Sequence, residues 1–529
     1  MSTESPKAPS AGERAVKDTA RLFGAHLVVG FIAFFSSAWL NRKLDPEQLA
    51  LWPLTLALSG LVASISSFGT GDSFVRIVPR LLARKRRRAA GAFLKTGLLI
   101  NLGACALLSV AIYLLADPIS HWGLVKAGTA PLVRLMAVAT FFAAFRERLS
   151  WALNATQRFR QAALEVLVVE VPRPPLMVVL YMLAGVKGVI ITLTLVPALS
   201  CVLQVIWLRP YLFRDWSLLA PRAVLRRSIA FYGVSLLGLV RSRLTYLLIP
   251  ALSSGKALAS YFVVDSLVTY LRVLNSRATA VVAPKLVEQE AQHPGVREAL
   301  YARCMRYVFL GLLPGYVLLA TLAGPATRLY GGGQYTDAAP LVVLLALEGL
   351  LEAIVLTQSI HIRAFSAPRH FLIRAALDAA LNIGLFAAFV PRWGASGAGV
   401  ALILRMLALV VQGDRVLRVS LRPRYDFAGL TTAITACLAP ALIAFAFQAW
   451  WPDTWWVLFP AGVLGVVAFF LSLRHRLRDE DAVLLVRSFP RGLMGWPRVQ
   501  ATAQWMAGYV RRPTAALPAD VVPPPAGAG

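Results

Sequence analysis

Two neighbouring apolar stretches of the sequence each carry a pair of arginines. Arg241 and Arg243 lie in the stretch 229–251, and Arg272 and Arg277 lie in 258–283. The planar guanidinium group of arginine can donate two parallel hydrogen bonds to phosphate oxygens. Within these stretches only Asp265 offers a compensating charge, so positive charge is left for an anion to neutralise. We therefore expect a site that binds a phosphate-bearing substrate.

Part of this polar set falls on one face of a helix. Asp265, Thr269, Arg272 and Ser276 are offset by 4, 7 and 11 residues, which at ~100° per residue places them within about 40° of one another. Such a stripe cannot face lipid, so it must face another helix or a water-filled cavity. Arg241 and Arg243 are two residues apart and point to different sides. The sequence leaves open which of them faces the cavity.

The alternative interpretation of these arginines is structural. They could pair with acids on other helices, for instance Glu348 and Glu352 in the stretch 339–362 or Asp378 in 371–390. The charges would then stabilise the fold and would bind no substrate. Both interpretations stay open at the level of the sequence.

A second polar set lies further along the chain. Arg374, Asp378 and Asn382 follow one another at four-residue intervals, and Arg405 lies midway along 396–418. Together with the two glutamates of 339–362, this set could bind a coupling cation or relay protons. We favour an internal salt-bridge network, because Arg405 would compete with any bound cation.

The first half of the chain carries a smaller polar group. Glu170 and Arg173 are three residues apart in the stretch 163–184 and are expected to pair with each other. Pro172, Pro174 and Pro175 surround this pair. Proline removes a backbone donor and clashes with the preceding turn, so the helix should be kinked here.

Several kinds of chemistry have no support in the sequence. The cysteines lie singly in apolar stretches with no C-x-x-C spacing, so neither a metal site nor a disulfide framework is predicted. No Walker A, G-x-S-x-G or H-E-x-x-H sequence occurs. We therefore predict a protein with no catalytic residues, metal or cofactor, which is not an enzyme. The formal net charge is +28, but apolar stretches separate the basic residues, so they form no continuous basic surface. This argues against nucleic acid as a partner.

The composition predicts that the elements carrying these residues are membrane-spanning helices. Hydrophobic residues make up 58% of the 529 and charged residues 15%, and the mean hydropathy is +0.65. A helix needs roughly 20 apolar residues to cross a bilayer. Runs of that length predict an all-α polytopic protein with fourteen spans, at 21–41, 48–70, 92–116, 130–154, 163–184, 188–208, 229–251, 258–283, 304–324, 339–362, 371–390, 396–418, 428–449 and 455–473.

The distribution of basic residues predicts the orientation of these spans. Most Lys and Arg residues fall in alternate loops and in the two tails, and the run Arg84 to Arg88 is the densest. Short loops rich in Lys and Arg stay in the cytoplasm, so both termini are expected there. The opposite loops carry few basic residues: Arg42, Lys43, Lys126, Lys187, Lys256, Arg328 and Arg392.

An internal repeat organises the predicted spans. Pro79-Arg80-Leu81-Leu82 returns as Pro284-Lys285-Leu286-Val287, and Gly188 and Gly394 open the sixth and twelfth spans. An even number of spans separates such equivalents, so the two lobes of six helices are parallel. The predicted organisation is a cytoplasmic tail 1–20, a first lobe 21–208, a linker 209–228, a second lobe 229–418, two extra helices in 428–473, and an interfacial and disordered tail 474–529.

Short motifs resemble the polysaccharide-transporter branch of the multidrug/oligosaccharidyl-lipid/polysaccharide (MOP) exporter superfamily, which includes bacterial O-antigen flippases. The turn Leu44-Asp45-Pro46-Glu47 is similar to a leucine-glycine-proline-glutamate turn of that family, with Asp45 in place of glycine. The stretch from Phe68-Gly69 to Arg76 and the glycine-rich segment from Trp393 to Ala398 also resemble family patterns.

The resemblance implies an alternating-access flippase of the bacterial inner membrane. It would carry an undecaprenyl-pyrophosphate-linked oligosaccharide from the cytoplasmic to the periplasmic leaflet, with the pyrophosphate held by Arg241, Arg243, Arg272 and Arg277. Expected partners are this substrate, membrane lipids, and the polysaccharide polymerase and assembly proteins. The alternatives are a cation-coupled multidrug exporter of the same superfamily and a membrane polysaccharide polymerase or ligase.

Overall fold

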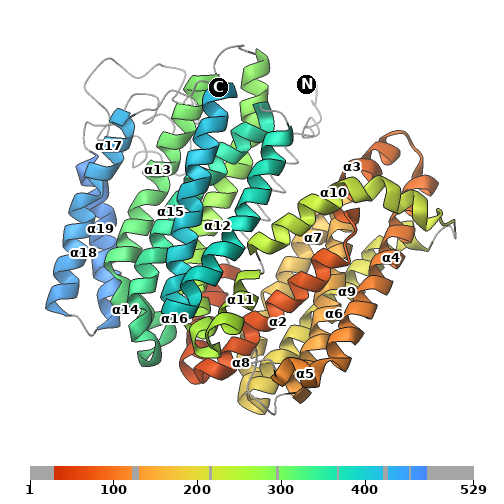
Figure 1. The fold of residues 1–529 in the computed structure, drawn as a ribbon, viewed down its shortest axis with the longest axis horizontal. Helices are drawn as coiled ribbons and strands as arrows, with labels where there is room; N and C mark the ends of the chain where they lie inside the picture. The colour runs from red at the N-terminus through yellow and green to blue at the C-terminus, as the bar shows by residue number, and fades with distance from the viewer. Residues whose placement is uncertain are drawn as a thin grey trace, which may run out of the picture. The chain divides into compact units, whose positions relative to one another are not determined.

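The computed structural model describes residues 29–121, 130–213, 217–242, 244–292, 297–365, 368–420, 427–451 and 454–473. Within these ranges every regular element is a helix, as the sequence predicted (Figure 1). After a first helix at 29–43, the elements are α2 (Pro46–Ile65), α3 (Thr70–Ala83), α4 (Arg87–Leu114), α5 (Ala116–His121), α6 (Ala130–Ala155), α7 (Phe159–Glu165), the π-helix η1 (Val166–Glu170), α8 (Arg173–Ala184), α9 (Val186–Leu212), α10 (Pro221–Ser242), α11 (Leu244–Leu252), α12 (Gly255–Gln292), α13 (Arg297–Thr321), α14 (Ala323–Gly331), η2 (Gly333–Ala338), α15 (Ala339–Phe365), α16 (Pro368–Ser420), α17 (Phe427–Ala436), α18 (Leu438–Trp450), η3 (Trp455–Val457) and α19 (Leu458–Ser472).

Nine of the described helices are long and apolar enough to cross a membrane. The helix over 130–155 is not among them, because Arg134, Arg146, Glu147 and Arg148 interrupt its apolar sequence. The predicted span 229–251 covers the end of α10 and all but the last residue of α11, and residue 243 lies outside the described residues. The predicted span 21–41 begins outside the described residues. The chain is therefore a multi-pass membrane protein, while the count of fourteen spans remains a prediction.

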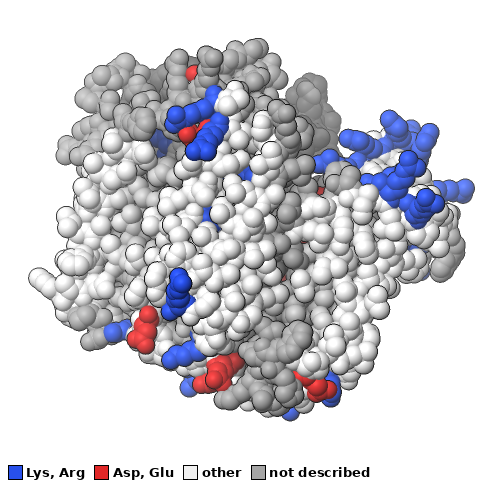
Figure 2. Space-filling view, in the orientation of Figure 1, with Lys and Arg blue, Asp and Glu red and all other residues white. Residues whose placement is uncertain are grey.

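Charged side chains are unevenly distributed over the surface in view. Lys and Arg gather where α3 ends and α4 begins, and large areas of the described surface carry neither acidic nor basic side chains (Figure 2). The basic group is the exposed run from Arg84 to Arg88. Leucines such as Leu107, Leu114 and Leu183 are more than two-thirds exposed on their helices. An apolar exterior of this kind suits lipid as the surrounding solvent.

Contacts divide the chain into two compact units. Unit 1 comprises Met1–Tyr270, Thr327–Leu345 and Ala367–Gln412, and unit 2 comprises Leu271–Ala326, Ala346–Ser366 and Gly413–Gly529. In unit 1, α2, α4 and α9 pack against α6 (Figure 1). In unit 2, α13 packs with α17, α18 and α19 around Leu313, Ala433 and Phe469. The two predicted lobes, 21–208 and 229–418, remain a prediction.

The turn before α2 shows how the sequence starts a helix. The Asp45 carboxylate accepts a hydrogen bond from the backbone N–H of Glu47 at 3.2 Å, and proline occupies the first helical position. Both features favour helix initiation. The helix ends at Ile65, earlier than the predicted residue 70, because Gly69 adopts a left-handed φ of 73° before α3. A Cβ at Gly69 would lie 2.2 Å from the Ser228 carbonyl oxygen of α10. The close approach of α10 therefore requires glycine at position 69.

Two turns in unit 1 repeat each other in backbone geometry. Gly185, between α8 and α9, has φ 59° and ψ −141°, and Gly394, inside α16, has φ 54° and ψ −127°. A Cβ on Gly188 would lie 1.8 Å from the Leu180 carbonyl oxygen, and a Cβ on Gly397 would lie 2.3 Å from the Phe389 carbonyl oxygen. In both cases the carbonyl belongs to the residue eight positions earlier. Gly394 therefore corresponds to Gly185, and not to Gly188 as the sequence pairing suggested. Glycine is required at both turns by the positive φ and by the close approach.

Candidate functional site

Of the four arginines predicted to bind an anion, the structure describes one side chain. Arg241 lies within α10 and Arg277 within α12, but their side chains are outside the described set, and Arg243 lies outside the described residues altogether. The side chain of Ser276 is likewise not described. Whether these residues converge therefore remains a prediction.

The described arginine, Arg272, forms ion pairs within unit 2. Its Nη2 contacts a carboxylate oxygen of Glu348, and its Nε lies 3.4 Å from Oε2 of Glu352. The two glutamates are four residues apart on α15, so they share one helix face. Glu348 is 4% exposed and Arg272 is 19% exposed. The partners are those named in the structural alternative, and the Arg272 side chain remains partly accessible.

Two other members of the predicted stripe, Asp265 and Thr269, lie in unit 1. Asp265 is buried and accepts a hydrogen bond from the Tyr246 hydroxyl, while Thr269 is exposed. Buried carboxylates need such partners, because desolvation of an unpaired charge is costly. The pairing with a tyrosine of α11 was not anticipated from the sequence.

The second polar set forms two groups of paired side chains on α16. Arg405 Nη1 donates to Asn382 Oδ1 at 3.1 Å, and its Nε lies 3.6 Å from Asp378 Oδ1. Arg374 Nη1 donates to Gln412 Oε1 at 3.3 Å. Arg374, Asp378, Asn382 and Arg405 are all buried, and Gln412 is partly exposed. Of the set proposed from the sequence, only Glu348 and Glu352 belong to the other unit, where they contact Arg272.

A cluster in unit 1 was only half foreseen. Glu170 and Arg173 pair as expected, with Arg173 Nη1 3.2 Å from Glu170 Oε2. Arg146 of α6 joins them, with Nη1 2.6 Å from Glu170 Oε1 and Nη2 2.8 Å from Glu165 Oε1. The Ser200 hydroxyl of α9 donates to the same Glu165 oxygen. We call these five residues the Arg146 network.

The π-helix η1 explains why the two glutamates reach one arginine. Residues five apart on an α-helix point about 140° apart, whereas a π-turn advances by fewer degrees per residue and brings them closer together. The Val171 N–H donates to the Val166 carbonyl at 3.0 Å, which is the i to i+5 bond of a π-turn. The prolines that follow cannot donate to the carbonyls of this turn. A pattern of two glutamates five apart before a proline cluster was the available sequence signal.

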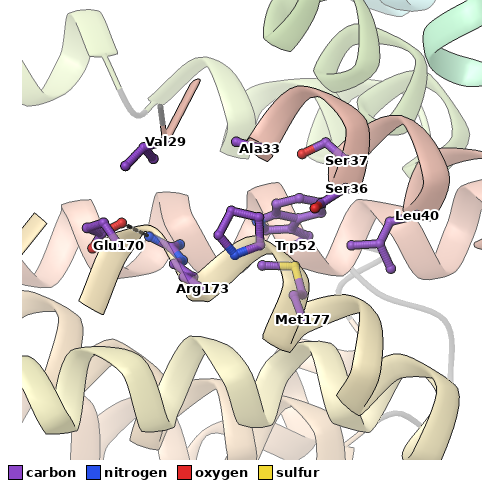
Figure 3. A pocket seen from close by; sticks show the side chains of 10 residues that line it. Val29, Ala33, Ser36, Ser37, Leu40, Trp52, Glu170, Arg173 and Met177 are labelled. Atoms are coloured by element: carbon purple, nitrogen blue, oxygen red, sulfur yellow. Dashed lines mark hydrogen bonds and ion pairs between the residues drawn. The ribbon is translucent and has the colours of Figure 1, made fainter. Parts of the chain in front are cut away.

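Two cavities of about 130 Å³ each adjoin this network, and Arg173 lines both. The polar cavity is lined by Thr55, Leu56, Ser59, Gly60, Ala143, Arg146, Glu147, Arg173, Leu193 and Pro197. The apolar cavity is lined by Val29, Ala33, Ser36, Ser37, Leu40, Trp52, Glu170, Arg173, Pro174 and Met177 (Figure 3). Glu147 pairs with Arg148 at 2.7 Å. The two cavities therefore offer adjacent polar and hydrocarbon-compatible spaces.

Residues 77–340 match the family described as "Polysaccharide biosynthesis protein". No curated protein matches the chain. A solved structure of the lipid II flippase MurJ in an inward closed conformation has a TM-score of 0.68 at 11% identity, covering 85% of this chain and 97% of MurJ. An inward-facing multidrug resistance MATE family transporter has a TM-score of 0.59 at 14% identity, covering 73% and 93%. A Vibrio cholerae MATE transporter has a TM-score of 0.55 at 15% identity, covering 76% and 98%.

The chain has the fold of the MurJ flippase and of these MATE family transporters, in line with the resemblance seen in the sequence motifs. At identities this low, the structural likeness speaks for the fold alone. The match to the polysaccharide biosynthesis family covers just under half of the chain.

Proposed function

We propose that this protein is a flippase that moves an undecaprenyl-pyrophosphate-linked oligosaccharide from the cytoplasmic to the periplasmic leaflet of the bacterial inner membrane by alternating access. One observation carries the proposal: a family match to polysaccharide biosynthesis coincides with the fold of a lipid II flippase. The MATE likeness supports the same fold but a different cargo. The family match favours the glycan cargo over drugs.

The charged residues of the described helices support a mechanism based on exchange of ion pairs. Arg272 is held by Glu348 and Glu352, and its side chain is 19% exposed. A pyrophosphate could replace one carboxylate on the guanidinium, because both present pairs of anionic oxygens that accept two parallel N–H bonds. Arg241, Arg243 and Arg277 would complete the site in this proposal. Both termini and the basic run from Arg84 to Arg88 would face the cytoplasm.

Depletion of the protein in its host tests this function. The lipid-linked oligosaccharide should accumulate on the cytoplasmic face and surface polysaccharide should fall, because synthesis continues while delivery stops. The measurement is the amount of lipid-linked oligosaccharide that a periplasmic glycan-modifying probe reaches in spheroplasts, compared with the total after membrane permeabilisation. Sensitivity to cationic drugs is the matched readout for the exporter alternative. Raised drug sensitivity with normal glycan delivery would favour that alternative and refute the proposal.

A further inference from the structure

An exposed basic surface extends over α3, the start of α4 and the start of α10. Figure 2 shows Lys and Arg side chains gathered over this part of unit 1. The three helices together carry one acidic residue, Asp72 of α3. We call the exposed cations the basic elbow; they are Arg76 and Arg80 on α3, the run from Arg84 to Arg88, and Arg222, Arg226 and Arg227 on α10. The basic elbow therefore carries a large excess of positive charge.

The packing beneath the basic elbow holds its elements together. Val224 of α10 is buried in one hydrophobic cluster with Val78 of α3 and Phe93 of α4. Exposed arginines lie close to these buried residues along the chain: Arg222 precedes Val224 by two positions, and Arg80 follows Val78 by two. The cations of separate helices are therefore presented on one continuous surface.

The lengths of the helices place the basic elbow at the level of lipid headgroups. α4 has 28 residues, and at ~1.5 Å per residue it is about 42 Å long, more than the ~30 Å of a hydrocarbon core. Arginine is costly inside that core, so the first turn of α4, with Arg87 and Arg88, extends beyond it. The end of α9 lies beside this turn, because a Cβ on Gly91 would lie 2.8 Å from the Tyr211 carbonyl oxygen.

Exposed apolar side chains lie near these cations along the chain. Val75, Leu218 and Ile229 are 41%, 54% and 55% exposed. A surface that combines cations with exposed apolar side chains is typical of helices that lie in the membrane interface. This combination suits a ligand with an anionic head and acyl chains, and it favours a lipid over a purely polar polyanion.

We infer that the basic elbow binds the headgroups of anionic phospholipids, such as phosphatidylglycerol, in the surrounding leaflet. Each Lys or Arg close to an anionic membrane surface adds to the attraction, and the cations of the basic elbow act together. The phospholipid is a component of the bilayer and is not the transported cargo. The inference therefore does not depend on the proposed function.

Native mass spectrometry of the purified full-length protein, titrated with phosphatidylglycerol or phosphatidylcholine, tests the inference. The wild-type protein should bind phosphatidylglycerol at least about tenfold more tightly, because phosphatidylcholine has no net charge. Replacing Arg80, Arg84 and Arg222 together with glutamine should weaken binding of phosphatidylglycerol by about 10- to 100-fold. None of the three forms an ion pair with another described residue, so the variant should fold.

Three exposed cations outside the basic elbow supply the matched control, namely Lys187, Lys256 and Arg392. Replacing all three with glutamine removes the same charge but should change the affinity for phosphatidylglycerol by less than about twofold, because distant exposed charges are screened. Replacing Arg80, Arg84 and Arg222 with lysine should preserve most of the affinity, since attraction to an anionic surface depends mainly on charge.

Three outcomes would overturn the inference. Unchanged affinity for phosphatidylglycerol in the basic-elbow glutamine variant would refute it directly. Equal losses in the two glutamine variants would show that net charge, and not this surface, governs lipid binding. Binding of poly-glutamate by the protein in neutral nanodiscs, without a preference for phosphatidylglycerol, would assign the surface to an acidic protein. Each outcome leaves the flippase proposal to be tested separately by depletion.

Discussion

Replacing Arg146 with alanine is expected to destabilise unit 1 by about 3–5 kcal/mol, the usual cost of removing one partner from a buried ion pair. The change leaves Glu165, whose side chain is 7% exposed, without its cation. It also leaves Glu170 with the longer contact to Arg173 alone. The predicted measurement is a marked fall in the midpoint of thermal unfolding in detergent. Among the described arginines of α6, Arg146 alone forms ion pairs with two carboxylates, Glu165 of α7 and Glu170 of η1.

The same helix supplies the control for this prediction. Arg134 lies on α6 and pairs with Asp117 at 2.9 Å, with side chains that are 42% and 60% exposed. Exposed ion pairs contribute at most about 1 kcal/mol, so Arg134→Ala should hardly shift the midpoint. Adding Glu165→Gln and Glu170→Gln to Arg146→Ala should recover much of the loss, because neutral amides cost less to bury. Equal destabilisation by Arg134→Ala and Arg146→Ala would contradict this account of the network.

Replacing Arg272 with alanine is expected to reduce translocation by about 10- to 100-fold, which corresponds to one lost charge-assisted contact with the pyrophosphate. Arg272→Lys should retain an intermediate rate, since lysine keeps the charge but cannot engage two oxygens at once. The measurement is the initial rate at which lipid-linked oligosaccharide reaches the opposite leaflet of proteoliposomes. Rates are normalised to the amount of folded protein.

A triple variant separates substrate binding from structural pairing at this position. If Arg272 only neutralises Glu348 and Glu352, then Arg272→Ala combined with Glu348→Gln and Glu352→Gln should regain transport together with stability. If Arg272 binds the pyrophosphate, the combined variant should recover stability and stay slow. Recovery of the wild-type rate would therefore refute the proposed phosphate role.

The sequence predicted the helical membrane fold because the physics of the bilayer is local: long apolar runs must form helices when no water can satisfy the backbone. The pair Glu170 and Arg173 was also predictable, because it depends only on spacing along one helix. The role of Arg146 was not, because it depends on a π-turn that rotates Glu165 and Glu170 toward α6. The sequence pairing of Gly394 with Gly188 was also wrong, because the backbone angles that match Gly394 to Gly185 cannot be read from residue types.

Long-range partners decide the remaining cases. The choice of Glu348 and Glu352 as acids for Arg272 was foreseen only as one alternative, because charge composition cannot say which helices become neighbours. The hydrogen bond from Tyr246 to Asp265 cannot be predicted from the pattern of apolar and polar residues in α11 or α12. The register of the glycine turns required φ values: Gly185 and Gly394 share a positive φ, while Gly188 and Gly397 share a close contact. The sequence alone cannot show whether a glycine is needed for a positive φ or for a close backbone contact.

The most direct test of the central claim is translocation by the purified protein. Proteoliposomes containing a polyprenyl-diphosphate-linked oligosaccharide are prepared with and without the protein, and the glycan exposed on the outer leaflet is measured over time with a membrane-impermeant glycosidase. We predict that the protein makes the protected fraction of the glycan accessible, at a rate that falls in Arg272→Ala. A protected fraction that stays equal in protein-containing and protein-free vesicles would contradict the account.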